Sequence, residues 1–383
     1  MRIELDTSDP GFLADPYPTY ARWRREAPVL LDERTGIRVV ARHAEVDAAL
    51  RDRRLGRAFL PHEPLDAMRP FNLLNERSLF EMEPPEHTRL RGLVSSVFTP
   101  RRAEALRPLV RAMAERRVRE GLRDVIADLA EPIPVAVIAE LLGVPEADRR
   151  RLRPWSRAIV RLYELEHDDE AARAAVRASE EFRAYLLDLA AERRRSPGED
   201  LVSGLAAAGL DDEELVATCV LLLNAGHEAT VNALGNGVLA LLERRAEWER
   251  LVADPSLVPA AVEELLRFDT PLPLFRRTAF ADTRVGGEPV PRGTRLALLF
   301  GSANRDEGAF PDPDRLDVAR SPNPHLAFGA GIHFCLGAPL ARVELQEELA
   351  ALVRLAPGLA LDGEPVRRPG HVIRGLERLP VSA

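Results

Sequence analysis

One short segment of the sequence, residues 328–337, places three glycines and a single cysteine at the start of a predicted helix. Glycine permits positive φ angles and a close approach of the backbone, which a flat cofactor requires. A thiol at the N-terminus of a helix ionises readily, because the helix dipole and free backbone N–H groups stabilise the thiolate. Cys335 is therefore predicted to be an anionic metal ligand. The alternative is an inert, buried cysteine in a turn, and the glycine pattern argues against it.

A second group of reactive residues lies in the middle of a long predicted helix, residues 211–243. Asp211 and Glu214 have the spacing of a capping box at its start, and the helix is longer than the usual length of about 10–14 residues. Residues 225–230 read Ala-Gly-His-Glu-Ala-Thr, so an acid and a hydroxyl occur within one turn of this helix. A glycine inside a helix costs about 0.5–1 kcal/mol relative to alanine, so Gly226 needs a functional reason.

The elements that must position these residues are mostly helical. Helical periodicity dominates residues 87–267, and short apolar runs between prolines and glycines indicate strands after residue 267. The segment 57–86 has five prolines and no clear period, and it is predicted to be a long functional loop. We expect a mostly α fold with minor β in a single domain, residues 1–383. The other predicted elements are a helix at 17–26, a hairpin of 29–31 and 37–40 turned at Thr35-Gly36, a strand at 295–300 and a helix at 339–355.

The composition limits the class of protein. Of the 383 residues, 46% are hydrophobic and 30% are charged, which favours a packed core and excludes wholesale disorder. The 53 basic and 61 acidic residues give a net charge of −8, which argues against nucleic acid or an anionic membrane as partner. Two cysteines exclude a disulfide framework and favour a reducing, cytoplasmic location. The longest apolar stretch, residues 215–242, holds too many polar groups for a membrane span, and Cys219 within it is predicted to be core filler.

The segment 328–337 resembles the cysteine-ligand loop of the cytochrome P450 family, soluble bacterial type, and the resemblance extends over most of the chain. It implies the P450 fold, in which the haem lies between the long distal helix and the cysteine loop with its helix. Cys335 is then the thiolate ligand of haem b, whose iron uses O2 as co-substrate, and thiolate ligation favours O–O cleavage. The further haem contacts that the resemblance implies are Ala225, Gly226, Phe328 and Gly337.

The two propionates of a haem need cationic or hydrogen-bonding partners. His87 and Arg91 are four residues apart in a segment that resembles the family's third helix, so both point from one helical face. Arg277, ten residues after Arg267, matches the family's propionate arginine, and His333 matches the last donor. Because four such residues are in register, the resemblance implies that they bind the propionates.

An acid and a base in the sequence, Glu264 and Arg267, are three residues apart on one helical face. They resemble the family's Glu-x-x-Arg motif, which braces the irregular segment below the haem. Residues 310–315 resemble that segment, and Arg315 or Arg320 is expected to complete the ion network. We predict a structural role for this group.

Residues 225–230 resemble the family's distal motif, small-Gly-x-acid-Thr-Thr, but with one departure. Ala229 stands where the family's alcohol follows the acid Glu228, and the hydroxyl comes one residue later, at Thr230. One step along a helix rotates a side chain by about 100°, so Thr230 cannot simply replace the missing alcohol. These three positions are the predicted catalytic residues, and we predict a proton relay through Glu228, ordered water and the substrate.

The resemblance also implies an apolar substrate pocket, as ligand sites commonly have. A small, apolar, secondary-metabolite substrate is expected. The alternative for each pocket residue is a purely structural role in the hydrophobic core. The predicted pocket residues are Phe59, Phe71, Leu223, Asn224, Ala225, Leu272, Leu274, Phe275 and Val372.

The sequence is thus identified as a P450 monooxygenase that inserts one oxygen atom into its substrate. No flavin or nicotinamide motif occurs, so electrons are expected from a ferredoxin and a ferredoxin reductase, and Arg89, Arg101 and Arg102 are candidates to contact that partner. Two alternatives stay open. Ala229 favours a P450 that performs coupling, desaturation or C–C cleavage, and a haem-binding carrier or sensor without turnover is the other. No nucleic acid, no membrane and a monomeric state are expected.

Overall fold

The computed structural model of the chain describes residues 1–164 and 167–382, and most of these residues are helical. Their contacts separate into two units. Unit 1 comprises Met1–Gly56, Arg107–Glu131 and Ala229–Ala383, and unit 2 comprises Arg57–Leu106 and Pro132–Glu228. The single domain expected from the sequence stays a prediction.

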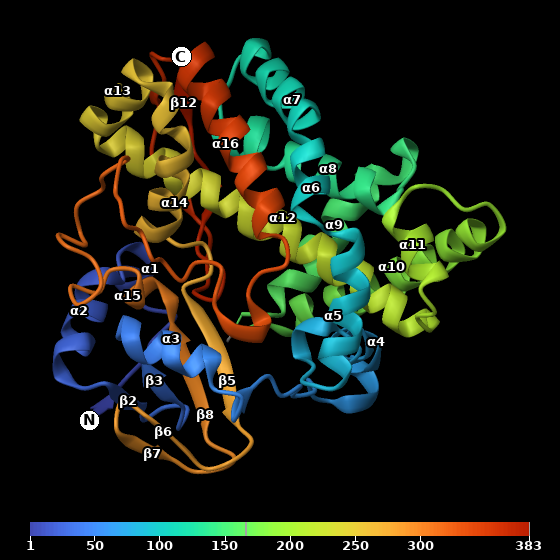
Figure 1. Cartoon of the computed structure of the whole chain (residues 1–383), viewed down its shortest axis with the longest axis horizontal. Helices are drawn as coiled ribbons and strands as arrows, with labels where there is room; N and C mark the ends of the chain where they lie inside the picture. Colours follow the sequence, from blue (N-terminus) through green and yellow to red (C-terminus); the bar gives the residue numbers. More distant parts are fainter. Residues whose placement is uncertain (165–166, 383) are drawn as a thin grey trace. The chain divides into compact units, whose positions relative to one another are not determined.

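Unit 1 contains a six-stranded sheet with the strand order β1-β2-β3-β8-β5-β4 (Figure 1). The predicted hairpin is confirmed, because β2 and β3 pair antiparallel with Val29 opposite Val40, and Gly36 turns the chain at φ +69°. β8 lies between β3 and β5 and pairs with both. The strands are β1 (Arg2–Ile3), β2 (Val29–Asp32), β3 (Arg38–Val40), β4 (Leu55–Gly56), β5 (Leu274–Ala279), β6 (Thr283–Val285), β7 (Glu288–Val290), β8 (Arg295–Leu299), β9 (Ala360–Leu361), β10 (Val366–Arg367), β11 (Leu376–Arg378) and β12 (Val381–Ser382).

The two faces of this sheet bury different helices, because successive side chains of a strand point to opposite sides. Val39 packs in a cluster with Trp23 of α2, whereas Val40 packs in a second cluster with Leu50 of α3. α3 therefore packs on the face of the sheet that carries Val40. The same helix also contacts the cysteine loop, residues 328–337, through Leu50. The helices of unit 1 are α1 (Pro10–Ala14), α2 (Tyr17–Glu26), α3 (His43–Arg51), α7 (Arg107–Glu120), α13 (Arg245–Ala253), α14 (Val258–Phe268), α15 (Phe300–Ala303) and α16 (Ala338–Leu355), with short turns η2 (Ile126–Ala130), η4 (Pro255–Leu257) and η5 (Gly331–His333).

All regular secondary structure in the described part of unit 2 is helical. Two of the breaks between its helices fall where the sequence predicts them, after Leu142 and after Arg195, next to Pro145 and the Ser-Pro-Gly segment that follows. The helices are α4 (Leu65–Glu76), α5 (Glu86–Val97), α6 (Pro100–Ala105), α8 (Pro132–Leu142), α9 (Arg149–Arg161), α10 (Asp169–Arg195) and α11 (Leu201–Ala207), with short turns η1 (Leu79–Glu81) and η3 (Glu146–Asp148).

The loop predicted for residues 57–86 is wrong in its centre, where α4 forms despite Pro70 inside it. Met68, Phe71 and Leu74 are buried at a spacing of three residues, so the helix is held by packing one apolar face, and it contacts α10. Proline lacks an N–H donor and usually ends a helix. Because the segment holds five prolines, the helical spacing of the apolar residues in α4 was not recognised in the sequence.

The long helix α12 (Asp212–Glu243) belongs to both units, and its predicted capping box is present. The backbone N–H of Glu214 donates to the Asp211 carboxylate at 2.8 Å, and the Asp211 N–H donates back to Glu214 at 3.3 Å. Cys219 is completely buried on this helix, and burial raises the pKa of its thiol to about 12, which agrees with core filler. In the described part of the chain, no helix combines the length and the apolar character needed to cross a membrane.

Candidate active site

The segment before α16 is closed by its own backbone into a short loop around Cys335. The Cys335 N–H donates to the carbonyl of Phe328 at 2.9 Å, and the Phe334 N–H donates to the carbonyl of Gly331 at 3.1 Å. Gly337 is the N-cap of α16, so the half-buried thiol of Cys335 lies two residues before the cap. The helix dipole therefore favours the thiolate form at this position.

Two glycines of this loop have backbone conformations that other residues rarely adopt. Gly329 has φ +68° and Gly331 has φ +70°. A Cβ atom at Gly331 would lie 2.3 Å from the backbone oxygen of Leu50 in α3, which no side chain can accommodate. The loop and α3 approach each other backbone to backbone at Gly331, which therefore requires glycine, whereas at Gly329 it is the positive φ that favours glycine.

A charged group that sequence reasoning missed supports the loop from α14 and α16. The Arg342 guanidinium donates to the Glu263 carboxylate at 2.8 and 2.7 Å and lies over the Phe328 ring at 4.5 Å. His325 contacts the same carboxylate at 3.1 Å. Burial opposes the charge of Glu263, but hydrogen bonds from Arg342 and His325 hold its pKa at about 2. Hydrogen bonding to Glu263 raises the pKa of Arg342, and the nearby Cys335 thiolate acts in the same direction.

The predicted Glu264–Arg267 pair is fully buried and forms the centre of an ion network. Arg267 donates to the two carboxylate oxygens of Glu264 at 2.7 and 2.8 Å. Arg320 adds contacts of 3.1 and 3.0 Å to the same oxygens. Of the two arginines expected to complete the network, the guanidinium of Arg320 does so, whereas Arg315 contributes its backbone carbonyl, which accepts from Arg320 at 2.9 Å. The expected Arg315 side chain is therefore corrected to Arg320, because it is the Arg320 guanidinium that contacts the Glu264 carboxylate.

The ion network is linked to the cysteine loop through one asparagine. Arg267 donates to the backbone carbonyl of Asn304 at 2.8 Å. The side-chain oxygen of Asn304 accepts from the Leu326 N–H at 2.7 Å, two residues before Phe328. The network therefore holds the chain that leads into the loop, as the resemblance implied.

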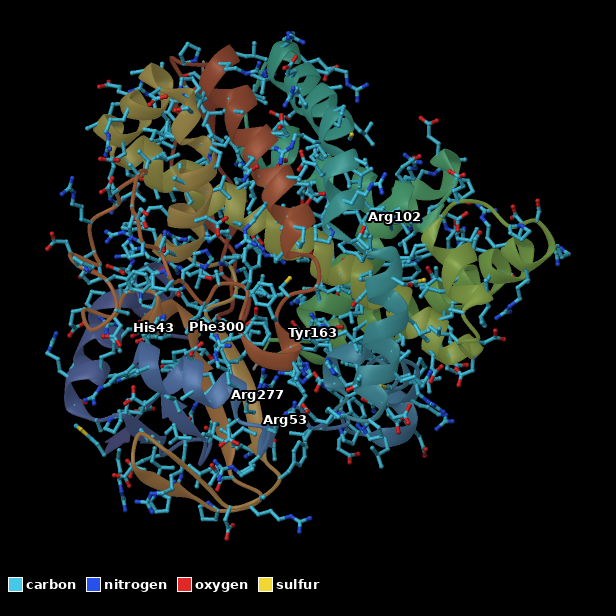
Figure 2. The ribbon with its side chains drawn as sticks, viewed as in Figure 1. His43, Arg53, Arg102, Tyr163, Arg277 and Phe300 are labelled. Carbon is cyan, nitrogen blue, oxygen red and sulfur yellow. The ribbon has the colours of Figure 1, made fainter. Side chains whose placement is uncertain are left out.

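Three of the other predicted site residues of unit 1, Leu274, Phe275 and Arg277, lie on β5. Arg277 is 4% exposed and its guanidinium donates to the neighbouring carbonyl of Arg276 at 3.0 Å. Phe275 stacks on Phe300 with 4.8 Å between ring centroids, and Figure 2 labels both Arg277 and Phe300. Leu274 points to the other side of β5 and is packed in the sheet core with Tyr20, which favours the core alternative for this pocket residue. The remaining positions, which are partly exposed, are Leu272, His333 and Val372.

In unit 2 the predicted residues lie on α4, α5 and α12 and in the segment that precedes α4. His87 is buried at the start of α5 and Arg91 follows one turn later, partly buried. Phe59 is partly buried, whereas Phe71 and Leu223 are completely buried, so both are packed like core residues. Asn224, the next residue of α12, is buried, and its side-chain amide lies beside the hydroxyl of Tyr163, a residue labelled in Figure 2. Burial raises the pKa of Tyr163 to about 12.

The middle of α12 has an exposed strip of small side chains. Ala225 is exposed and Gly226 and Ala229 are partly exposed, whereas residues 231–241 are all buried. His227, Glu228 and Thr230, between and beside the small residues, are buried. Between Leu222 and Leu241 of this helix, the residues that are exposed or partly exposed are therefore all small.

The Thr230 hydroxyl points to a carboxyl that sequence reasoning also missed. It hydrogen-bonds Glu344 of α16, which is 2% exposed. Burial raises the pKa of Glu344 to about 8, although the hydrogen bond from Thr230 lowers it. Glu344 is 114 residues from Thr230, so no local spacing could reveal this contact.

Of the three arginines predicted to contact a redox partner, Arg89 is engaged within unit 2. It forms ion pairs with Glu86 at 3.0 Å and with Glu214 at the start of α12. Arg101 and Arg102 lie exposed on α6. Arg89 therefore ties α5 to α12, while its side chain stays 44% exposed.

The sequence matches the cytochrome P450 family over residues 167–355. The chain is 43% identical to nocardicin C N-oxygenase of Nocardia uniformis subsp. tsuyamanensis, with 96% of each chain covered. It is 39% identical to the cytochrome P450 monooxygenase PikC of Streptomyces venezuelae, covering 99% of this chain and 94% of that one. The crystal structure of P450BioI with a ligated acyl carrier protein has a TM-score of 0.94 at 34% identity, covering 98% of this chain and all of that one.

The chain belongs to the cytochrome P450 family, and its fold is the P450 fold predicted from the sequence. It is an oxidoreductase of the monooxygenase class. The family uses haem iron and O2, acts on apolar substrates and receives electrons from redox partners.

The buried network gives a prediction about stability. Glu264→Gln keeps the size of the side chain but leaves the guanidinium groups of Arg267 and Arg320 buried without their counter-charge. We expect the free energy of unfolding to fall by about 3–5 kcal/mol, measured by urea denaturation of the holoprotein. The matched control is Glu249→Gln, which removes the exposed pair with Arg245 and should change it by less than about 1 kcal/mol. Equal effects of the two variants would contradict the role given to the network.

Proposed function

We propose that Cys335 binds the iron of haem b as a thiolate, and that the protein inserts one oxygen atom from O2 into a small apolar substrate. The observation that carries this proposal is the cysteine loop. Its backbone approaches α3 so closely that Gly331 admits no side chain, and it presents the thiol at the start of α16 beside Arg342. When bound, the haem supplies oxygen activation, and a thiolate ligand favours O–O cleavage. The residues present fit such a group, since they offer a half-buried thiol before the N-terminus of α16, where the thiolate form is favoured.

The cationic residues support the same assignment. Arg277 is almost completely buried, and a guanidinium offers charge-assisted hydrogen bonds to an anion such as a propionate. We assign Arg277 and His333 of unit 1 to a haem propionate, and His87 and Arg91 of unit 2 to the same role. Phe328 and Gly337 of the loop and Ala225 and Gly226 of α12 are the remaining haem contacts that we propose.

Proton delivery is assigned to the middle of α12. Glu228 is a buried acid next to the open strip at Ala225, Gly226 and Ala229. Because Ala229 provides no hydroxyl, the relay is completed by ordered water and a polar group of the substrate. General acid delivery of this kind contributes about 10²–10⁴-fold to a rate.

The substrate is proposed to be a secondary metabolite. Nocardicin C N-oxygenase and the polyketide biosynthesis P450 PksS of Bacillus subtilis, which is 36% identical, are named for such compounds. Apolar, partly exposed side chains at Phe59, Leu272, Phe275 and Val372 suit such a ligand, and Asn224 adds one amide. A ferredoxin with its reductase is the proposed electron source.

A second candidate reaction is favoured by Ala229. A P450 without the alcohol beside its acid can couple, desaturate or cleave its substrate instead of inserting oxygen. The mass of the product separates the reactions, because insertion adds one oxygen atom and desaturation removes two hydrogens. A carrier without turnover, the remaining alternative, consumes no NADPH beyond the background of the redox proteins.

The ligand assignment is tested by the difference spectrum of the reduced carbonyl complex. The wild type is expected to show the long-wavelength Soret band of a thiolate-bound haem. Cys335→Ser should abolish this band, and the control Cys219→Ser should keep it, because Cys219 is buried core. A wild type whose spectrum is that of a histidine-bound haem would overturn the proposal.

The relay is tested by restoring the missing alcohol. Ala229→Thr places a hydroxyl directly after Glu228, and we expect a lower fraction of electrons lost as hydrogen peroxide with a ligand that shifts the spin state. The control is Ala229→Val, which has the shape of threonine without the hydroxyl and should not lower that fraction. If threonine changes neither the turnover nor the peroxide fraction, or if valine has the same effect as threonine, the proposed relay is wrong.

A further inference from the structure

A buried amide lies in the turn of α12 that precedes the strip of small side chains. Asn224 is 4% exposed and comes directly before the exposed residue Ala225. Among the described residues of the chain, neither the oxygen nor the nitrogen of this amide has a hydrogen-bond partner. A buried polar group that has lost water and gained no partner carries its full desolvation cost. Asn224 therefore has both an acceptor and a donor to offer to a ligand.

A second buried asparagine of unit 2 shows how an amide is satisfied when its role is structural. Asn72 of α4 is 7% exposed, and its oxygen accepts from the His62 N–H at 2.9 Å. Its nitrogen donates to the His62 carbonyl, also at 2.9 Å. Both ends of this amide hold the segment that precedes α4. Asn224 has the same groups, but within the described chain no N–H and no C=O is paired with them.

Tyr163 connects the Asn224 amide to aromatic side chains of unit 2. Its hydroxyl lies beside the amide, and its ring centroid is 6.0 Å from that of Phe71. Phe71 in turn meets the His62 ring edge to face at 5.0 Å. Burial raises the pKa of Tyr163 to about 12, so its hydroxyl is neutral at neutral pH. A neutral amide and a neutral phenol favour a neutral ligand group, because an ionised group would lose its hydration without gaining a counter-charge.

Packing alone does not account for an amide at position 224. Leucine has a similar size and no polar group to desolvate, and the two preceding residues of α12, Leu222 and Leu223, are buried leucines. A side chain that is unfavourable for the free protein is typical of a functional site, because such sites are selected for binding rather than for stability.

The open donor and acceptor indicate the chemistry of the group that binds there. We propose that Asn224 determines specificity by binding an amide group of the substrate, with its nitrogen donating to the ligand C=O and its oxygen accepting from the ligand N–H. These are the two contacts that Asn72 makes with His62. The amide subsite rests on the proposed function and deepens it, because it names the polar group of an otherwise apolar substrate. A site that binds an N–H rejects an analogue without it, since its own acceptor is then left unpaired.

The subsite is tested with laurolactam and with the lactone and the ketone of the same ring size. The three rings differ only in the N–H, oxygen or CH2 next to the carbonyl. Their binding to the wild-type holoprotein is measured by equilibrium dialysis. We expect the lactam to bind about tenfold more tightly than the lactone, which corresponds to one hydrogen bond. Equal or weaker binding of the lactam, or no binding of it, would overturn the proposal.

Two variants of α12 show whether the preference for the lactam comes from Asn224. Asn224→Leu should abolish it by weakening the lactam, while the ketone binds as tightly as before or more tightly. Thr218→Val is the matched control, because Thr218 is also buried on α12 but lies about 240° around the helix from Asn224. It should keep the wild-type preference. A preference that survives in Asn224→Leu, or disappears in Thr218→Val, would contradict the assignment.

The stability of the ligand-free holoprotein separates a binding role of Asn224 from a structural one. Asn72→Leu should lower the midpoint of urea denaturation, because it removes two hydrogen bonds. Asn224→Leu should leave this midpoint unchanged or raise it, because it removes a buried amide without partners among the described residues. If both variants lower the midpoint equally, Asn224 supports packing and the amide subsite is refuted.

Equilibrium dialysis does not depend on the iron ligand, so the amide subsite and the proposed function can fail separately. A wild type that shows the thiolate-type carbonyl spectrum but no preference for the lactam refutes the amide subsite alone. A wild type without that spectrum refutes the haem-thiolate assignment, whichever ring compound it prefers.

Discussion

The rest of the site depends on one steric constraint, the backbone contact between Gly331 and Leu50. A Cβ atom at position 331 would lie 2.3 Å from the Leu50 oxygen, so the loop can lie here only as bare backbone. This contact fixes the cysteine loop against α3, and α3 is fixed by packing on the sheet through Leu50. The position of Cys335 is thereby set by the sheet on one side and by the start of α16 on the other. A ligand held from two rigid elements keeps its place whether or not a cofactor is bound.

Buried acids near this loop differ in charge because their partners differ. Glu264 receives two guanidinium groups and the Asp317 N–H at 3.0 Å, so its carboxylate oxygens have hydrogen-bond partners. Glu263 has Arg342 and His325 and stays ionised. Among the described residues, Glu344 has only the Thr230 hydroxyl and Glu348 has no cation, so burial raises the pKa of both carboxyl groups. The fold thus pairs acids with cations where the backbone must be braced, and it buries Glu344 and Glu348 beside α12 without such a pair among the described residues.

Features set by local sequence could be predicted, whereas those set by distant partners could not. The hairpin at Gly36, the limits of α12 and the cysteine loop depend on turn residues, caps and glycines within a few positions, and these were correct. The helix α4 was missed because prolines obscure a period that packing against α10 stabilises. The choice of Arg320 over Arg315 depends on which side chain reaches Glu264 in three dimensions. The Arg342–Glu263 and Thr230–Glu344 contacts join residues 79 and 114 positions apart, so only the fold brings them together.

The displaced hydroxyl of α12 has a structural explanation that the sequence alone could not supply. A rotation of about 100° per residue turns Thr230 away from the open side of Ala229, and the structure shows that it turns toward α16. A threonine at this position in an apolar environment would leave its hydroxyl without a partner, at a cost of about 1–3 kcal/mol. Glu344 removes that cost. Ala229 and Thr230 therefore have complementary places on α12. The small side chain of Ala229 lies where the helix is partly exposed, and the hydroxyl of Thr230 lies where the helix meets the buried acid Glu344. Moving the hydroxyl to position 229 without changing Glu344 would fill the open strip and leave the acid without its contact.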